Sequence, residues 1–154
     1  MNHLSTFVLL AVGAFAAQDP AVPEPKQVTY AVIVNDNNST KEEGDAAKKL
    51  VKSLFLKDLT RWPDGSLAKP YDREPNSPEH VAFLREVLAM SEAEVARHWL
   101  RAKNMNGTTP PREVDTDSML QKHIARHDGA FGIVKLDAAK APGVRILFEF
   151  RAPQ

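Results

Sequence analysis

The stretch Phe55-Leu-Lys-Asp-Leu-Thr-Arg-Trp-Pro-Asp-Gly65 joins the end of a helical pattern to a turn that contains tryptophan, proline and glycine. Proline and glycine favour backbone angles at which a chain reverses, so residues 62–65 are predicted to form a turn. A second stretch, Gly129-Ala-Phe-Gly-Ile-Val134, places two glycines within an apolar strand pattern. Glycine in a strand permits a tight turn or close backbone packing.

Outward from these stretches, strand-like and helical patterns alternate along the chain, which is the ordering of an α/β domain. Strands are predicted over 29–34, 67–71, 130–134 and 144–150. Helices are predicted over 40–55, 78–88, from 91 onward and from 116 to about 128, and 104–112 is predicted to be a loop. Capping boxes are expected at Thr40, with Ser39 as the alternative cap, and at Ser91; single caps are expected at Ser77 and at Thr116 or Asp117. The apolar spacing predicts that Val81, Trp99 and Met119 face the core.

Both opening stretches resemble signatures of phosphate-type periplasmic substrate-binding proteins, in the order and approximate spacing of that family's second lobe. Tyr30-Ala-Val-Ile-Val-Asn35 resembles the strand that ends in asparagine before the first helix. The resemblance implies a single lobe of a type 2 periplasmic-binding-protein-like fold, α/β with a mixed sheet flanked by helices, over residues 28–151. Such proteins close two lobes on a ligand, whereas 154 residues make roughly one domain, so half of the usual ligand cage is expected to be missing.

Composition narrows the classes of function. The chain has 43% hydrophobic residues and no cysteine, so it can bury a core and has neither a thiol nucleophile nor a cysteine-ligated zinc site. Its 20 basic and 20 acidic residues cancel, so no global field attracts nucleic acid. Any anion site must therefore be local.

The first residues have the pattern of an export signal. Phe7 to Ala16 is an apolar run too short to span a bilayer, and Ala14-Phe15-Ala16 has the small residues that signal peptidase requires. We therefore expect a signal peptide at 1–16, a flexible tether at 17–27, a periplasmic or secreted location, and no membrane span after cleavage. An uncleaved membrane anchor remains the alternative.

The resemblance also implies ligand-binding residues, because the family holds its anion with an arginine, a serine hydroxyl and the amides of a helix start. Arg73 and Ser77 match the arginine and the serine, and Asn76 and Glu79 occupy neighbouring positions of the motif. Asn76 and Pro78 replace flanking glycines, and Glu79 replaces a threonine. Two interpretations follow: Arg73 and Ser77 bind an oxyanion at this helix start, or they serve as an ion-paired arginine and a helix cap.

Few other residues of the sequence suggest a metal-binding or catalytic site. His123 and His127 have the i, i+4 spacing of two metal ligands, but two ligands do not make a site, and no metal or cofactor is predicted. Asp115 and Asp117 suit either a cation or a helix start. The chain lacks the common nucleophile, nucleotide and zinc-protease motifs, so no enzymatic activity is expected.

These patterns lead to two hypotheses of function. In the first, the protein is an exported solute-binding-like protein, related to phosphate ABC transporter substrate-binding proteins, that binds phosphate or another small oxyanion. In the alternative, it is a ligand-free interaction or sensor module that meets an envelope protein or a second copy of itself.

Overall fold

The computed structural model describes residues 23–154. The predicted signal peptide at 1–16 and most of the predicted tether at 17–27 lie outside the described residues. Residues 23–26 have no regular structure, and the first strand begins at Gln27.

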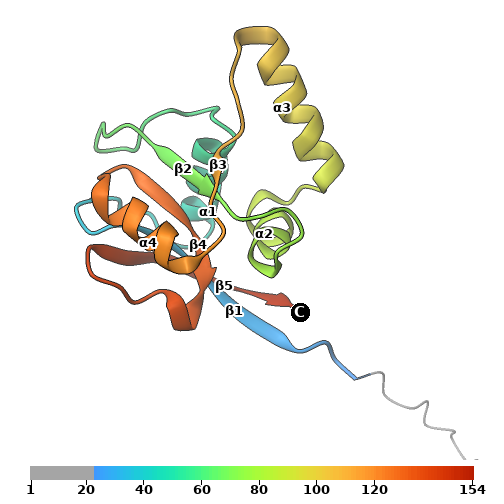
Figure 1. The fold of residues 1–154 in the computed structure, drawn as a ribbon, viewed down its shortest axis with the longest axis vertical. Helices are drawn as coiled ribbons and strands as arrows, with labels where there is room; N and C mark the ends of the chain where they lie inside the picture. The colour runs from blue at the N-terminus through green and yellow to red at the C-terminus, as the bar shows by residue number, and fades with distance from the viewer. Residues whose placement is uncertain (1–22) are drawn as a thin grey trace, which may run out of the picture.

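Five strands form one mixed sheet in the order β3-β2-β4-β1-β5 (Figure 1). Strand β2 is parallel to β3 and to β4, whereas β1 is antiparallel to β4 and to β5. The α/β fold with a mixed sheet that the sequence predicted is therefore confirmed. The strands are β1 Gln27–Asn35, β2 Lys69–Asp72, β3 Arg112–Glu113, β4 Ala130–Lys135 and β5 Val144–Pro153.

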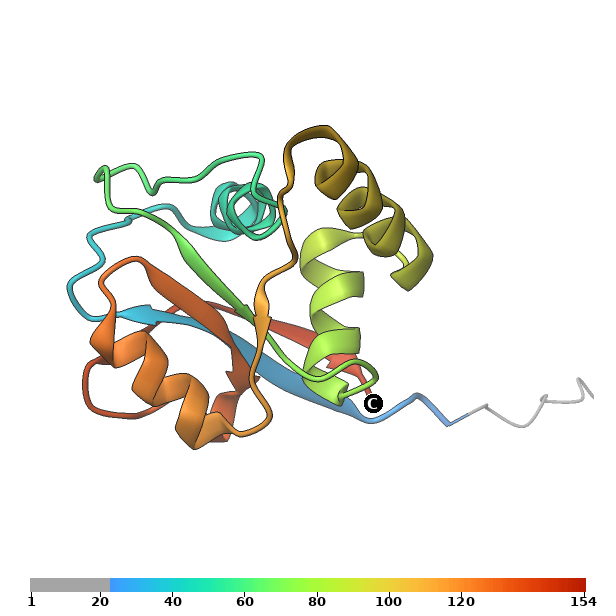
Figure 2. The same cartoon turned by 45° about the horizontal axis from the view of Figure 1, so that its top comes forward.

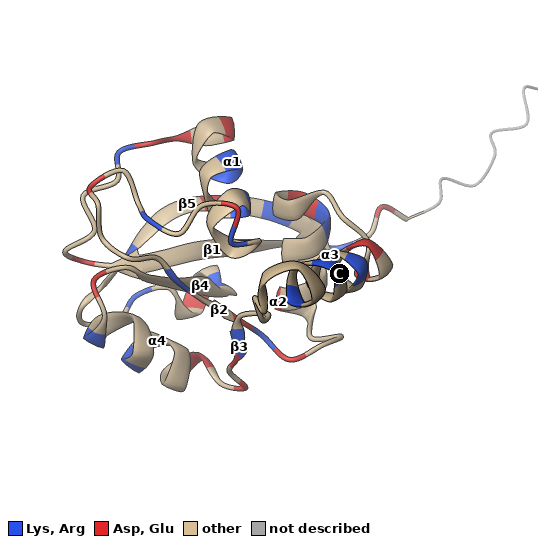
Figure 3. Cartoon of the chain, turned by 90° about the horizontal axis from the view of Figure 1, so that it is seen from above, with Lys and Arg blue, Asp and Glu red and all other residues tan. Residues whose placement is uncertain are grey.

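Helices cover both faces of this sheet, and two hydrophobic clusters lie beneath them. Side chains of β1 alternate between the clusters: Val32 packs with α1 and α2 residues, whereas Ile33 packs with α4 residues. Figure 3 shows α1 and α4 on opposite sides of the sheet. The helical elements are α1 Gly44–Phe55, α2 Pro78–Phe83, the π-helical segment η1 Leu84–Leu88, α3 Glu92–Asn106, α4 Asp117–Arg126 and the 3₁₀ turn η2 Leu136–Ala138.

The helix starts confirm three predicted caps and correct one. Ser77 caps α2, Ser91 and Glu94 form the capping box of α3, and Thr116 caps α4. The predicted capping box at Thr40 is wrong, because α1 begins at Gly44. The Thr40 amide instead donates to Asn38 Oδ1 at 3.0 Å, and such local asparagine turns compete with helix formation.

The helix predicted over 78–88 is confirmed in its bounds, although its geometry changes to π-helical at Leu84, and it stops where Ala89 adopts a left-handed φ of 51°. Two positions predicted to face the core are wrong. Val81 and Met119, predicted to face the core, are 43% and 47% exposed. The residues next to them in sequence occupy the core positions instead. The apolar stripe on each of these two helices is therefore narrower than the sequence suggests.

Helix α3 lies outermost, beyond α2 and η1, and an extended segment with β3 leads back to the sheet (Figure 2). The helix continues to Asn106, past the loop predicted from Asn104, and ends at Gly107 with φ 74°. Val95 and Trp99 anchor it to the core. Among residues 23–154, none of the helices combines the length and the apolar character that a membrane crossing requires.

Candidate functional site

The carboxyl ends of β2, β3 and β4 meet at one edge of the sheet because these strands run in the same direction. In open α/β sheets this edge is where ligands bind. Arg73 follows β2 directly, and the Val114 amide extends the pairing of β3 by donating to Asp72 O at 2.9 Å. We call this region the carboxyl edge; it comprises Asp72, Arg73, Ser77, Glu79, His80, Asp117 and Lys135.

Arg73 is buried, with 6% of its surface exposed. Its Nη1 donates to Asp117 Oδ1 at 2.9 Å, and its Nη2 donates to the Asp115 carbonyl oxygen at 3.0 Å. Among the described residues, Arg73 Nε has no hydrogen-bond partner. The segment that leads from β3 into the first turn of α4 thus fixes the guanidinium and leaves its Nε–H group without a partner. Asp117 acts as its counter-ion and lies in the first turn of α4, where a carboxylate suits the helix dipole.

The turn between Arg73 and α2 uses its polar groups internally. Asn76 is exposed and adopts a left-handed φ of 66°, a conformation that asparagine tolerates. The Ser77 amide donates to Glu74 O at 3.0 Å, and the Ser77 hydroxyl oxygen accepts the His80 amide at 3.2 Å. Pro78 supplies no amide. The hydroxyl hydrogen of Ser77 therefore remains its one donor toward a ligand.

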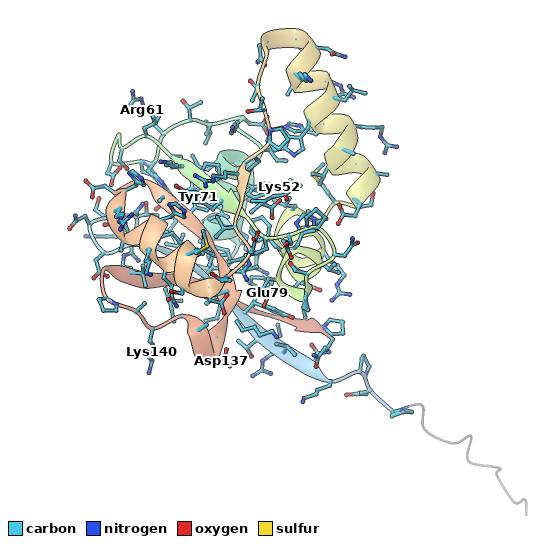
Figure 4. The ribbon with its side chains drawn as sticks, in the orientation of Figure 1. Lys52, Arg61, Tyr71, Glu79, Asp137 and Lys140 are labelled. Carbon is cyan, nitrogen blue, oxygen red and sulfur yellow. The ribbon has the colours of Figure 1, made fainter. Side chains whose placement is uncertain are left out.

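Glu79 points back over the sheet, where it is 7% exposed. Its Oε1 lies 4.0 Å from Lys135 Nζ at the end of β4, which places a partial counter-charge beside the carboxylate. Figure 4 shows Glu79 in the first turn of α2, on the side of the helix that faces the sheet. Burial raises the pKa of the Tyr30 hydroxyl, and the Glu79 charge raises it further, against a lowering by Arg85.

His80 connects β2 to the start of α3. Its Nδ1 lies 2.9 Å from Asp72 Oδ1, and that same oxygen accepts the Arg73 amide at 2.8 Å. Its Nε2 lies 2.9 Å from Glu92 Oε1, but outside hydrogen-bond geometry, so this contact is an ionic attraction to an exposed carboxylate. Burial alone would lower the pKa of His80; the hydrogen bond and charge of Asp72, with the charge of Glu92, outweigh it and raise the pKa.

The charges at the carboxyl edge nearly compensate one another. Each cation there has an acidic partner, in the pairs Arg73–Asp117, His80–Asp72 and Lys135–Glu79. An anion at this edge would gain from directed hydrogen bonds rather than from an excess of positive charge.

The structure brings Arg73, Ser77 and Glu79 to one edge, with Asn76 in the exposed turn beside them. The sequence patterns did not point to Asp72, Lys135 or Glu92 as part of the site. Asp72 and Lys135 belong to it because β2 and β4 are parallel neighbours, and Glu92 adjoins it because α3 begins beside His80. The alternation of strands and helices gives the type of each element but not the order of strands in the sheet.

The remaining candidates lie elsewhere. The His123 ring stacks on Tyr71 at 5.0 Å between centroids, and residues 23–154 contain no group of three side chains suited to a metal ion. Trp62 is buried, and its Nε1 donates to Gly129 O at 2.9 Å. A Cβ on Gly129 would lie 1.8 Å from Leu67 O, which explains the glycine by close backbone packing.

Comparison with known proteins rests on structure alone, because no family model and no curated protein matches the sequence. An ABC-type phosphate transport receptor from Vibrio cholerae superimposes with a TM-score of 0.59 at 14% identity, covering 78% of this chain and 45% of the receptor. A provisionally named phosphate ABC transporter substrate-binding protein from Clostridium perfringens, with bound phosphate, gives 0.58 at 16% identity, covering 78% and 44%. PstS from Borrelia burgdorferi gives 0.56 at 11% identity, covering 79% and 49%.

This chain thus spans less than half the length of each of these proteins. Identities of 11–16% relate the folds and leave the activity to be established separately. The described domain has the α/β fold of one lobe of the phosphate ABC transporter substrate-binding proteins, as the resemblance in sequence implied.

Proposed function

We propose that the protein is an exported solute-binding-like protein that binds phosphate or another small oxyanion at the carboxyl edge. It acts in the periplasm or outside the cell, as part of or derived from an ABC transport system, and performs no chemistry on its ligand. The similar structures support this proposal, because they are phosphate receptors rather than enzymes.

The observation that carries the proposal is the unused Nε donor of Arg73. A buried polar group without a partner is costly, and native proteins satisfy nearly all such groups. Here the free donor belongs to a buried guanidinium directly after a central strand, where ligands of α/β sheets bind. A tetrahedral oxyanion matches guanidinium geometry and supplies the missing acceptor.

The other residues of the motif have more limited roles in this proposal. The Ser77 hydroxyl can donate one hydrogen while its oxygen caps α2. Asn76 shapes the turn through its left-handed backbone and presents its amide at the rim. Glu79 repels a fully ionised phosphate but accepts a hydrogen bond from one that still carries a proton, so the proposal favours hydrogen phosphate over sulfate.

Calorimetric titration of the full chain with phosphate, and separately with sulfate, tests this function at low ionic strength. Arg73→Gln removes the guanidinium, and Arg101→Gln, at an exposed position of α3, is the matched control for the loss of one positive charge. We expect saturable binding in the micromolar range, on the order of −8 kcal/mol, that is lost in the first variant and kept in the second. A folded wild-type chain that produces no saturable heat with either anion would reject the solute-binding hypothesis.

A further inference from the structure

A second surface gathers cations from three elements around His123. Lys69 begins β2, Arg112 begins β3, and Arg126 ends α4. Burial and the positive charges of these three residues and of His127 lower the pKa of His123. We call this region the α4 basic surface; it comprises Lys69, Arg112, His123, Arg126 and His127.

The cations of the α4 basic surface lack acidic partners. Within residues 23–154, no salt bridge involves Lys69, Arg112 or Arg126. The nearby Asp128 carboxylate accepts a hydrogen bond from Asn37 Nδ2 at 3.1 Å. The cations of this surface outnumber the one carboxylate beside them, that of Asp128, so the surface attracts anions.

A hollow of about 630 Å³ opens within this surface. Its size falls in the range of small-ligand sites. Lys69, Arg126 and His127 line it with Leu67, Ala68, Asp128 and Gly129. The hollow lies at the amino ends of β2 and β4, and the carboxyl edge lies at their other ends, so the two regions are separate.

The walls of the hollow are held in place by the fold. The Lys69 amide donates to Gly129 O at 2.9 Å, which joins β2 to the start of β4. The buried Tyr71 ring contacts Lys69 Nζ, 5.8 Å from the ring centroid, and stacks on His123. The cationic side chains therefore extend from fixed backbone positions, so binding has to order the side chains but not the backbone.

We propose that this hollow binds a small anion that carries two or more phosphate or carboxylate groups, independently of the carboxyl edge. One anionic group contacts Lys69 and Arg126 in the hollow, and another extends from the hollow toward His123 and Arg112, whose charge acts on His123. Arg112 and His123 do not line the hollow, so a single phosphate bound inside it would leave them without contact, which is why several charged groups are specified. A small solute fits the dimensions of the hollow better than a macromolecule does.

Titration of the full chain with tripolyphosphate, and separately with citrate, tests the proposal at low ionic strength. The variant Lys69→Gln/Arg112→Gln/Arg126→Gln removes three charges from the surface. Its matched control, Lys48→Gln/Lys49→Gln/Lys52→Gln, removes three from α1 on the opposite face of the sheet (Figure 3). We expect affinity to fall about tenfold or more in the first variant and to remain within about twofold in the control. Saturable binding of either probe that is weakened only in the first variant supports the proposal.

NMR titration of the His123 ring locates the bound anion independently. Saturating tripolyphosphate should raise the pKa of His123, since it neutralises the surrounding cations, and Arg73→Gln should leave that rise intact. Equally weakened binding in both triple variants would show that affinity depends on net charge alone, which would overturn the proposal. Absence of saturable binding, an unmoved His123 pKa, or loss of binding in Arg73→Gln would also overturn it.

Discussion

The carboxyl edge and the α4 basic surface both contain arginine, but the arginine charge is compensated in the first region and uncompensated in the second. Arg73 is buried and paired with Asp117 at 2.9 Å, whereas Arg126 is exposed and has no salt bridge within residues 23–154. A charge removed from water requires a counter-ion, and a charge left in water does not. The arginine highlighted by the family motif is therefore already neutralised, and the one outside the motif retains its attraction for anions.

The largest expected difference between the two regions is in stability. Arg73→Ala should lower the free energy of unfolding by about 2 kcal/mol, because the Asp115 carbonyl and the partly exposed Asp117 lose their donor. Arg126→Ala should change it by less than about 0.5 kcal/mol. Urea denaturation of both variants measures the contrast. Equal losses would mean that the α4 basic surface contains an ion pair after all.

The Asp117 carboxylate should compete with an oxyanion for Arg73. Asp117 is in direct contact with Arg73, so a bound oxyanion lies close to its charge. Asp117→Asn should therefore strengthen phosphate binding about fivefold, since two unit charges about 4 Å apart interact by about 1 kcal/mol even in water. Asp45→Asn, in the first turn of α1, is the matched control for loss of a helix-start carboxylate. Calorimetry gives both affinities. Weaker binding in Asp117→Asn would show that Asp117 positions Arg73 rather than competing for it.

The histidines of the two regions should make stability depend on pH with opposite signs. The raised pKa of His80 contributes stability that is present below its unfolded value near 6.5 and is lost as pH rises through the folded value. The lowered pKa of His123 contributes stability that is present above 6.5 and is lost as pH falls toward the folded value.

Denaturation across pH 5 to 8 separates these contributions through two variants. Removing the His80 contribution with His80→Gln should abolish the loss of stability as pH rises. His123→Gln should abolish the loss as pH falls. The same direction of change in both variants would contradict the contrast between compensated and uncompensated regions.

The smallest effect expected is local to the α4 basic surface. Lys69→Gln removes one of the cations near His123, so the pKa of His123 should rise while the free energy of unfolding changes by less than about 0.5 kcal/mol. NMR titration of the imidazole measures the rise. Lys48→Gln on the opposite face should leave the value unchanged, and an equal rise in that control would indicate a long-range effect of net charge.

Sequence patterns predicted the strands and caps well because those features depend on neighbouring residues. The strand expected over 29–34 lies within β1, and Ser77, Ser91 and Thr116 each cap the helix that follows. The capping box predicted at Thr40 is wrong because the Thr40 amide donates to the Asn38 side chain instead. The two-residue strand β3 has no pattern of its own, since it exists only by pairing with β2.

The candidate site was predictable only in part for the same reason. Arg73 and Ser77 stand out in sequence because they belong to a short motif. Asp117 is 44 residues from Arg73, and the residues that flank Asp117 in the sequence do not indicate the ion pair. The α4 basic surface was not predicted, because α2, η1 and α3 separate β2 from β3 and α4 along the chain, and only the pairing of strands brings these elements together.

The sequence by itself determined the α/β class, the resemblance to one lobe of a phosphate receptor, and the helix start beside Arg73. These follow from local propensity, apolar periodicity and short motifs, which neighbouring residues control. The tertiary structure alone decided which arginine is neutralised and which cations share a surface. Strand order and long-range packing set those distances, and electrostatic interactions depend on distance and burial rather than on position along the chain.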